Sequence, residues 1–230
     1  MKSKVGLIVG GSGALGKSVV SVFKLHGWRL LNLDVRANEQ ADANITLRAD
    51  SIQSQLSLIH EQTKAFSQSF DSVICTAGGF EAGSVRDKDV FEKYERLDRM
   101  NAQSALLTGH LGAHYLGEQG FLCLTGAAKV FEGPVNWAFA YGLTKQATHA
   151  LALHLAERED LPKSASVCTI LPTTIDTPAN REAMTPDGTW LPPQKVAEVL
   201  RSWAEGENRP ENGSFAKLTY KNECVVPEFL

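Results

Sequence analysis

A glycine-rich run near the start of the chain, Gly11-Ser12-Gly13-Ala14-Leu15-Gly16, constrains the fold more than any other stretch. The apolar run 5–9 precedes it and is typical of a strand buried on both faces. Apolar side chains at helical spacing follow it, namely Leu15, Val19, Val22 and Phe23. A glycine turn between a strand and a helix lets backbone N–H groups approach a pyrophosphate at the positive helix end. The sequence therefore predicts a dinucleotide-binding unit, with an ordinary glycine turn as the alternative.

Asp34 is the candidate that decides which dinucleotide binds. We expect Gly27 to end the first helix and the next strand to span 28–33, so that Asp34 follows this strand directly. A carboxylate about 20 residues beyond the glycines can accept both hydroxyls of the adenosine ribose. Its charge would repel a 2′-phosphate, which favours NADH and leaves NADPH possible but weaker. Arg36 could soften that preference, and a solvated turn acid is the alternative role for Asp34.

Size and composition fit one domain that covers residues 1–230. Hydrophobic residues make up 43% and charged residues 21%, which is ordinary for globular proteins. The net charge of −3 argues against nucleic acid as a partner. The apolar run after residues 1–4 is too short for a signal peptide, and no stretch approaches the about 20 apolar residues that a membrane span needs. We expect a cytoplasmic protein with no membrane partner. The four cysteines show no C-x-x-C spacing, and we expect them to be free thiols in this reducing compartment.

Strand and helix patterns alternate along the rest of the chain. Strands are expected around 45–47, 73–75, 120–124, 166–171 and 214–220, and helices over 52–66, 89–117, 140–159 and 195–204. Asp50 or Ser51 could cap the second helix. Residues 125–139 are expected to be loop-rich, and 173–193, rich in Pro, Thr, Asp and Gly, an irregular substrate loop or lid. The alternation predicts an α/β fold with a Rossmann-type, doubly wound parallel sheet and helices on both faces.

Tyr141 and Lys145 form the candidate chemical pair. Four residues apart at the start of a helix, they share one face. A nearby ammonium favours the phenolate, so we expect Lys145 to lower the pKa of Tyr141 and make it a general acid. Lys145 could also bind the nicotinamide ribose. Such pairs are common on helices, but the dinucleotide motif upstream favours catalysis.

These features resemble the short-chain dehydrogenase/reductase family over nearly the whole chain. The residues that carry the resemblance are the glycine turn, Asp34, Ala77-Gly78-Gly79, Asn101, Tyr141, Lys145, Leu171-Pro172 and Thr177. The resemblance implies that Tyr141 and Lys145 are catalytic and that two long helices form a homodimer contact. The implied cofactor-binding residues are Gly10, Gly11, Ser12, Gly13, Ala14, Leu15, Gly16, Asp34, Asp50, Ala77, Gly78, Gly79, Lys145, Pro172, Thr174 and Thr177.

The chain departs from the family at Ala128, 13 residues before Tyr141, where the family usually has a serine that holds a carbonyl oxygen. Among the residues near it, only Thr125 carries a hydroxyl. The chain resembles the branch that reduces quinonoid dihydropterins, whose conjugated imine-type substrate needs no such serine. The stretches that carry this resemblance are 10–16, 77–80, 125–129, 141–147, 171–178 and 208–210.

The resemblance implies NADH-dependent regeneration of a tetrahydropterin, such as tetrahydrobiopterin, with Phe80, Ala128 and Tyr141 around the pterin. Phe80 stands where that branch is expected to have tryptophan. Two alternatives stay open: a short-chain reductase of carbonyl substrates, disfavoured by Ala128, and a non-catalytic dinucleotide sensor, disfavoured by the intact Tyr141 and Lys145. His110 and His114 share a helix face, but the sequence places no third ligand beside them, so no metal is expected.

Overall fold

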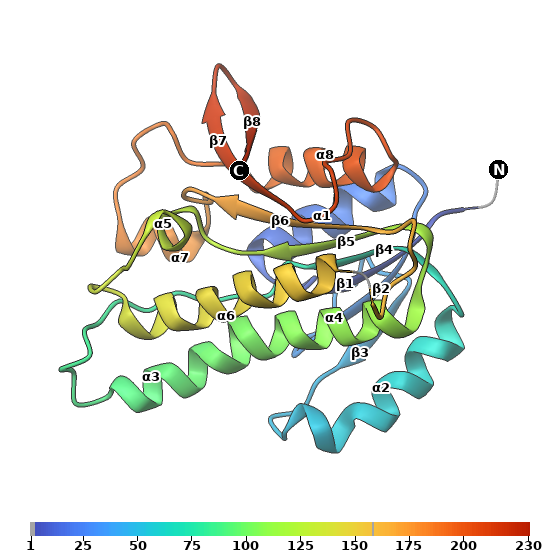
Figure 1. Ribbon diagram of the computed structural model, residues 1–230, viewed down its shortest axis with the longest axis horizontal. Helices are drawn as coiled ribbons and strands as arrows, with labels where there is room; N and C mark the ends of the chain where they lie inside the picture. Colours follow the sequence, from blue (N-terminus) through green and yellow to red (C-terminus); the bar gives the residue numbers. More distant parts are fainter. Residues whose placement is uncertain (1–2, 158) are drawn as a thin grey trace.

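An eight-stranded sheet runs through the computed structural model, which describes residues 3–157 and 159–230 (Figure 1). Its strands are β1 (Val5–Val9), β2 (Arg29–Asp34), β3 (Ala43–Thr46), β4 (Phe70–Cys75), β5 (Leu116–Thr125), β6 (Ser166–Pro172), β7 (Ser214–Lys221) and β8 (Cys224–Phe229). They lie in the order β3-β2-β1-β4-β5-β6-β7-β8. The pairs from β3 to β7 are all parallel, which confirms the predicted doubly wound fold. Strand β8, which the sequence did not predict, pairs antiparallel with β7 and ends the sheet.

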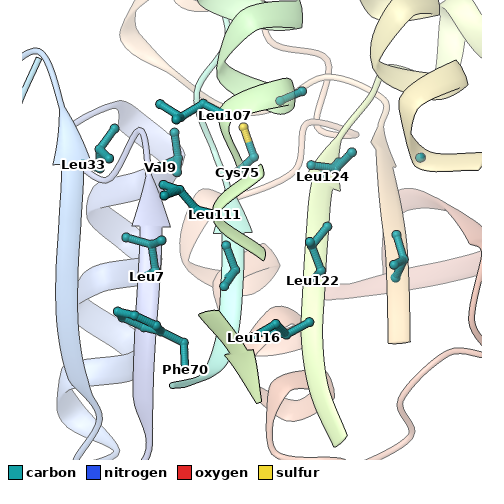
Figure 2. Close-up of a cluster of buried hydrophobic side chains, with 14 of the residues drawn as sticks. Leu7, Val9, Leu33, Phe70, Cys75, Leu107, Leu111, Leu116, Leu122 and Leu124 are labelled. Carbon is teal, nitrogen blue, oxygen red and sulfur yellow. The ribbon is translucent and has the colours of Figure 1, made fainter. Parts of the chain in front are cut away.

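Helices cover both faces of this sheet. They are α1 (Ala14–Leu25), α2 (Ile52–Phe66), α3 (Val90–Leu97), the π-helical turn η1 (Asp98–Gln103), α4 (Ser104–Tyr115), α5 (Ala128–Glu132), α6 (Phe139–Ala156), α7 (Pro178–Ala183) and α8 (Pro193–Ala204). Helices α1 and α8 pack on one face, while α2, α4 and α6 pack on the other. Successive strand residues point to opposite faces, so Leu7 and Val9 of β1 belong to one core and Ile8 to the other. Figure 2 shows the first core, where Leu107 and Leu111 of α4 meet strand side chains.

The chain follows the expected path through its first βαβ unit. Apolar side chains of α1, among them Val19 and Phe23, are fully buried. Gly27, at φ +77°, ends the helix as predicted, and the Trp28 N–H donates to the Phe23 carbonyl at 3.1 Å. β2 then runs beside β1 and ends at Asp34. The glycine turn and Asp34 therefore lie at the same, carboxyl edge of the sheet.

Three segments differ from the sequence-based expectation. The helix expected over 89–117 is interrupted by the π-helical turn η1, and its last residues belong to β5. The expected loop 125–139 contains α5. Residues 173–193 contain α7 and are tied together by a bridge between Ile175 and Leu191. Short helices of five or six residues carry too little periodicity to be read from sequence.

The helix ends and the cysteines agree more closely with the expectation from the sequence. Ser51, not Asp50, caps α2, and its Oγ accepts the Ser54 N–H at 3.2 Å. The helix expected over 140–159 is α6; Arg158, within that expected range, lies outside the described residues. All four cysteines are free thiols, and Cys224 in β8 is the exposed one.

Within the part of the chain that the structure describes, no helix combines the length and the apolar character that a membrane crossing requires.

Candidate active site

The glycine turn closes the carboxyl end of β1 tightly against the start of α1. A Cβ on Gly16 would collide with the carbonyl oxygen of Gly10, so a larger residue would push the helix away from the turn. No side chain caps α1 at Gly13, and no acidic residue occupies its first turn. The N–H groups at this positive helix end, from Ala14 to Gly16, are therefore free of side-chain acceptors and suited to an anion.

Asp34 holds the turn from the end of β2. Its Oδ2 accepts the Ser12 N–H at 2.9 Å, and its Oδ1 accepts the Arg36 N–H at 3.3 Å. The carboxylate is half-buried and keeps acceptor capacity for ribose hydroxyls. Its place beside the glycine turn is the one expected from the sequence.

A network of asparagines beneath this turn was not identified from the sequence. The buried Asn38 donates from Nδ2 to the Gly11 carbonyl at 2.6 Å, and the buried Asn32 donates to Ser12 Oγ at 3.2 Å. Asn32 also donates to Asn44 Oδ1 at 2.8 Å. The available signal was the single amide in the apolar strand 29–34. These hydrogen bonds fix the backbone of the glycine turn from below.

Asp50 is less closely connected to this group. It is exposed in the turn between β3 and α2, where its carbonyl accepts from Gln55 at 3.1 Å. β3 is the edge strand of the sheet, so Asp50 lies at the outer end of the candidate cofactor site.

The small residues after β4 are held by Asn101. Its Oδ1 accepts the Gly79 N–H at 2.9 Å, and its Nδ2 donates to the Gly79 carbonyl at 3.1 Å and to Thr144 Oγ1 at 3.0 Å. Asn101 lies in η1, where the wider π-helical turn breaks the regular helix, as π-bulges often do at functional sites. A Cβ on Gly78 would lie 3.2 Å from Lys145 Nζ, so this turn and α6 meet at one point.

Tyr141 and Lys145 lie in the first two turns of α6. Lys145 is 4% exposed, and its Nζ donates to the Thr125 carbonyl at 2.8 Å. Burial lowers the pKa of Lys145 to about 8 and raises the pKa of Tyr141 to about 12. The expectation that Lys145 lowers the pKa of Tyr141 was therefore wrong for this structure, because burial dominates. Tyr141 is accordingly a neutral phenol, the form that gives a proton.

Aromatic rings form a wall beside Tyr141. The Phe80 ring lies 5.0 Å from the Tyr141 ring and 5.8 Å from the Trp137 ring, measured between centroids. Phe80 is 41% exposed and Trp137 57% exposed, so this wall faces solvent. Backbone hydrogen bonds from Gly83 to Trp137 and from Phe139 to Gly83, both 2.8 Å, join the two loops. The sequence did not single out Trp137; its place four residues before Tyr141 was the available signal.

The position of the family's serine is apolar here. Ala128 is buried at the start of α5, and the Ala127 N–H donates to Nε2 of the buried His149 at 3.2 Å. Thr125, the nearby hydroxyl, donates to the Cys75 carbonyl at 2.7 Å. The Thr125 hydroxyl proton is therefore already engaged in a hydrogen bond within the sheet. The site offers a phenol and a buried amine, with the Thr125 hydroxyl turned to the sheet.

The last predicted cofactor residues follow β6. Pro172 ends this strand, and the Thr174 carbonyl accepts the Leu191 N–H at 2.7 Å. Thr177 caps α7, with its Oγ1 accepting the Asn180 N–H at 3.2 Å. These contacts hold the segment over the same sheet edge as the glycine turn and Tyr141.

Comparison with known proteins gives a relative that spans nearly the whole chain. Dihydropteridine reductase from Dictyostelium discoideum is 36% identical over 228 residues, which cover 97% of this chain and 98% of that protein. No family model matches the chain.

Solved structures share the fold. A short-chain dehydrogenase from Burkholderia cenocepacia in complex with NADP has a TM-score of 0.77 at 20% identity, covering 93% of this chain and 95% of its own. A short-chain dehydrogenase/reductase from Serratia marcescens has a TM-score of 0.79 at 17% identity, covering 94% of this chain and 96% of its own. At these identities the likeness concerns the fold.

Proposed function

Because the chain belongs to the dihydropteridine reductase branch of the short-chain dehydrogenase/reductase family, whose members are NAD(P)H-dependent oxidoreductases, we propose that it reduces a quinonoid dihydropterin to the tetrahydropterin with NADH. The observation that carries the substrate assignment is the site around Tyr141. An aromatic wall stands on one side of the phenol, and the buried methyl group of Ala128 replaces a hydroxyl. This arrangement suits a flat, already polarised ring better than a ketone oxygen.

The residues at the carboxyl edge fit a nicotinamide dinucleotide. The tight contact between Gly10 and Gly16 and the uncapped start of α1 suit a pyrophosphate. Asp34 would accept the ribose hydroxyls and repel a 2′-phosphate, which supports NADH over NADPH. Lys145 would bind the nicotinamide ribose. A bound reduced nicotinamide supplies the hydride.

Tyr141 would complete the reduction by giving one proton. Hydride addition puts a negative charge into the pterin ring, and a ring nitrogen then takes the phenolic proton, so that hydride and proton together make the tetrahydro form. Burial disfavours the phenolate that is left, so Tyr141 takes up a proton again readily. Phe80 and Trp137 would stack against the pterin and exclude water from one side. Solvent then returns the proton to Tyr141.

The test is NADH oxidation, followed spectrophotometrically, with freshly generated quinonoid dihydropterin as substrate. A panel of simple ketones and a reaction without substrate serve as controls. We expect rapid turnover of the pterin and little of the ketones. Efficient ketone reduction would replace this proposal with a carbonyl reductase, and no turnover with saturable NADH binding would indicate a dinucleotide sensor.

We also propose that the chain forms a homodimer through α4 and α6. These helices lie side by side on one face of the sheet (Figure 1). Their exposed side includes Leu106, Leu143 and Leu153, which are 59%, 42% and 57% exposed. Leu151 and Leu155 are half-buried, and Leu155 approaches Gly109 of α4, so Leu155 belongs to the contact between the helices.

A further inference from the structure

Three histidine side chains meet where α2 passes the end of α4. His60 comes from α2, and His110 and His114 lie one turn apart on α4. One ligand nitrogen from each lies within 4.8 Å of the others, and the ring centroids are 4.7 to 5.0 Å apart. Among residues 3–157 and 159–230, these histidines form the one group of at least three His, Cys, Asp or Glu residues whose ligand atoms lie close enough together to hold a metal ion. The sequence placed no third ligand beside His110 and His114, because His60 is 50 residues away.

The imidazoles of His60 and His110 are in the form that binds metals. Burial lowers the pKa of His60, and the proximity of His114 adds to the effect. Burial also lowers the pKa of His110, followed by the effects of His114 and His60. Both rings are therefore neutral at neutral pH and each carries a nitrogen lone pair.

Tyr115 orients one of these rings. Its hydroxyl lies 2.8 Å from His60 Nδ1, which leaves Nε2 to point at His110 Nε2, also 2.8 Å away. Metal-bound histidines usually have their second nitrogen held by such a partner. The two Nε2 atoms can approach this closely only with a proton between them, since two lone pairs repel. A metal ion in place of that proton would need the nitrogens to separate only to about 3.3 Å, the spacing set by Zn–N bonds of about 2.0–2.1 Å in a tetrahedron.

We propose that His60, His110 and His114 bind one first-row divalent transition-metal ion of the Zn²⁺ type. Three imidazole nitrogens favour zinc, copper, nickel or cobalt over magnesium or calcium, which prefer oxygen. The exposed side of His114 leaves a fourth position for water. The ion joins α2 to α4, about 14 Å along the helix axis from Asn101, and therefore stabilises the fold without taking part in the reduction.

The test uses Zn²⁺ itself, added to the full chain in competition with a chromophoric chelator. A Cys224→Ser background removes the exposed thiol, which would otherwise bind zinc. We expect one Zn²⁺ per chain and a rise in the thermal midpoint of about 5–10 °C when free Zn²⁺ exceeds the dissociation constant 100-fold. Mg²⁺ at the same concentration should cause no shift. The Co²⁺-loaded protein should show the visible absorption of a tetrahedral site.

Variants separate this site from other surface histidines. His110→Ala and His114→Ala each remove a ligand and should weaken Zn²⁺ binding by more than about 100-fold. Tyr115→Phe removes only the partner of His60 and should weaken it by about 10–100-fold. His154→Ala, an exposed histidine on α6, is the matched control and should bind as the parent does. His114 is exposed, so His114→Ala should fold, which circular dichroism verifies. Absence of Zn²⁺ binding, or unchanged affinity in His110→Ala and His114→Ala, would overturn the proposal.

Discussion

Burial moves the pKa values of Tyr141 and Lys145 in opposite directions, to about 12 and about 8. Both shifts have the same cause, because a low-dielectric surrounding disfavours the phenolate and the ammonium alike. Near neutral pH the phenol of Tyr141 is therefore neutral, and the amine of Lys145 is mostly protonated. The pair holds one transferable proton and one positive charge, which is the state a reductase needs before it protonates its substrate.

Replacing Tyr141 with phenylalanine removes that proton and leaves the ring. We expect turnover of quinonoid dihydropterin to fall about 10²–10⁴-fold, the usual contribution of a general acid. NADH binding, measured by fluorescence titration, should persist because Tyr141 is not among the predicted cofactor-binding residues. Unchanged turnover would remove Tyr141 from the mechanism.

Asp34→Ala tests the cofactor preference. Loss of a charge-assisted hydrogen bond costs about 1.5–3 kcal/mol, so kcat/KM for NADH should fall about 10–100-fold. The value for NADPH should fall less, because the repulsive charge is gone. Glu39→Ala, an exposed acid further along the same connection, is the control. An NADH/NADPH ratio that stays the same in Asp34→Ala would contradict the assigned role.

His149 makes the free energy of unfolding depend on pH in the acidic range. Burial, followed by the charge of Lys145, lowers the pKa of His149 from 6.5 to about 4. Between these values the unfolded chain binds a proton that the folded chain does not, so the free energy of unfolding falls as pH drops from 6.5 towards 4. The full loss is about 3 kcal/mol.

Urea unfolding at a series of pH values measures this effect. His149→Gln, whose amide oxygen can still accept the Ala127 N–H, should lose less stability over the same pH range than the parent. His154→Gln, on the exposed side of the same helix, should follow the parent. Equal slopes for all three proteins would show that another group causes the acid sensitivity.

At the scale of elements, the π-helical turn η1 connects the helical face to the cofactor edge. It turns Asn101 inward, where one amide side chain binds Gly79 after β4 and Thr144 on α6. A regular α-helix through 98–103 would shift the side chains that follow along the helix. The turn therefore sets the distance between the Gly78–Gly79 segment and the residues Tyr141 and Lys145 on α6.

Asn101→Ala should lower the free energy of unfolding by about 1–3 kcal/mol, since it leaves buried polar partners without hydrogen bonds. Hydrogen exchange at the Gly79 amide should become faster, a change that a general loss of packing would not confine to this segment. Gln103→Ala, which removes a hydrogen bond to Asp98 on the same turn, is the control. Normal protection at Gly79 in Asn101→Ala would contradict this role.

At the scale of the molecule, the helices on one face leave apolar side chains uncovered. Leu106→Glu combined with Leu153→Glu should convert the proposed dimer to a monomer, because each buried charge at an interface is costly. Sedimentation velocity measures the change. Leu25→Glu, at a 77% exposed position on α1 across the sheet, should leave the oligomeric state unaltered. A parent chain that sediments as a monomer would refute the proposed dimer.

The sequence by itself determined the parts that depend on local forces. Buried parallel strands are continuous apolar runs, helices show periodic faces, and glycine permits the turn at 10–16 and the positive φ of Gly27. Parallel strands bring their carboxyl ends to one edge, so the glycine turn, Asp34, Gly78 and Tyr141 had to come together there. The family resemblance followed from the same residues.

Only the tertiary structure decided which distant groups touch and how deeply they are buried. Trp137 beside Phe80, Asn38 beneath the glycine turn, and His60 beside His110 join segments whose spacing in sequence carries no periodic signal. The pKa of Tyr141 rose where the sequence suggested a decrease, because desolvation depends on every surrounding element and not on the helix partner four residues away. Burial is a property of the packed chain, and it sets the pKa values of Tyr141 and Lys145.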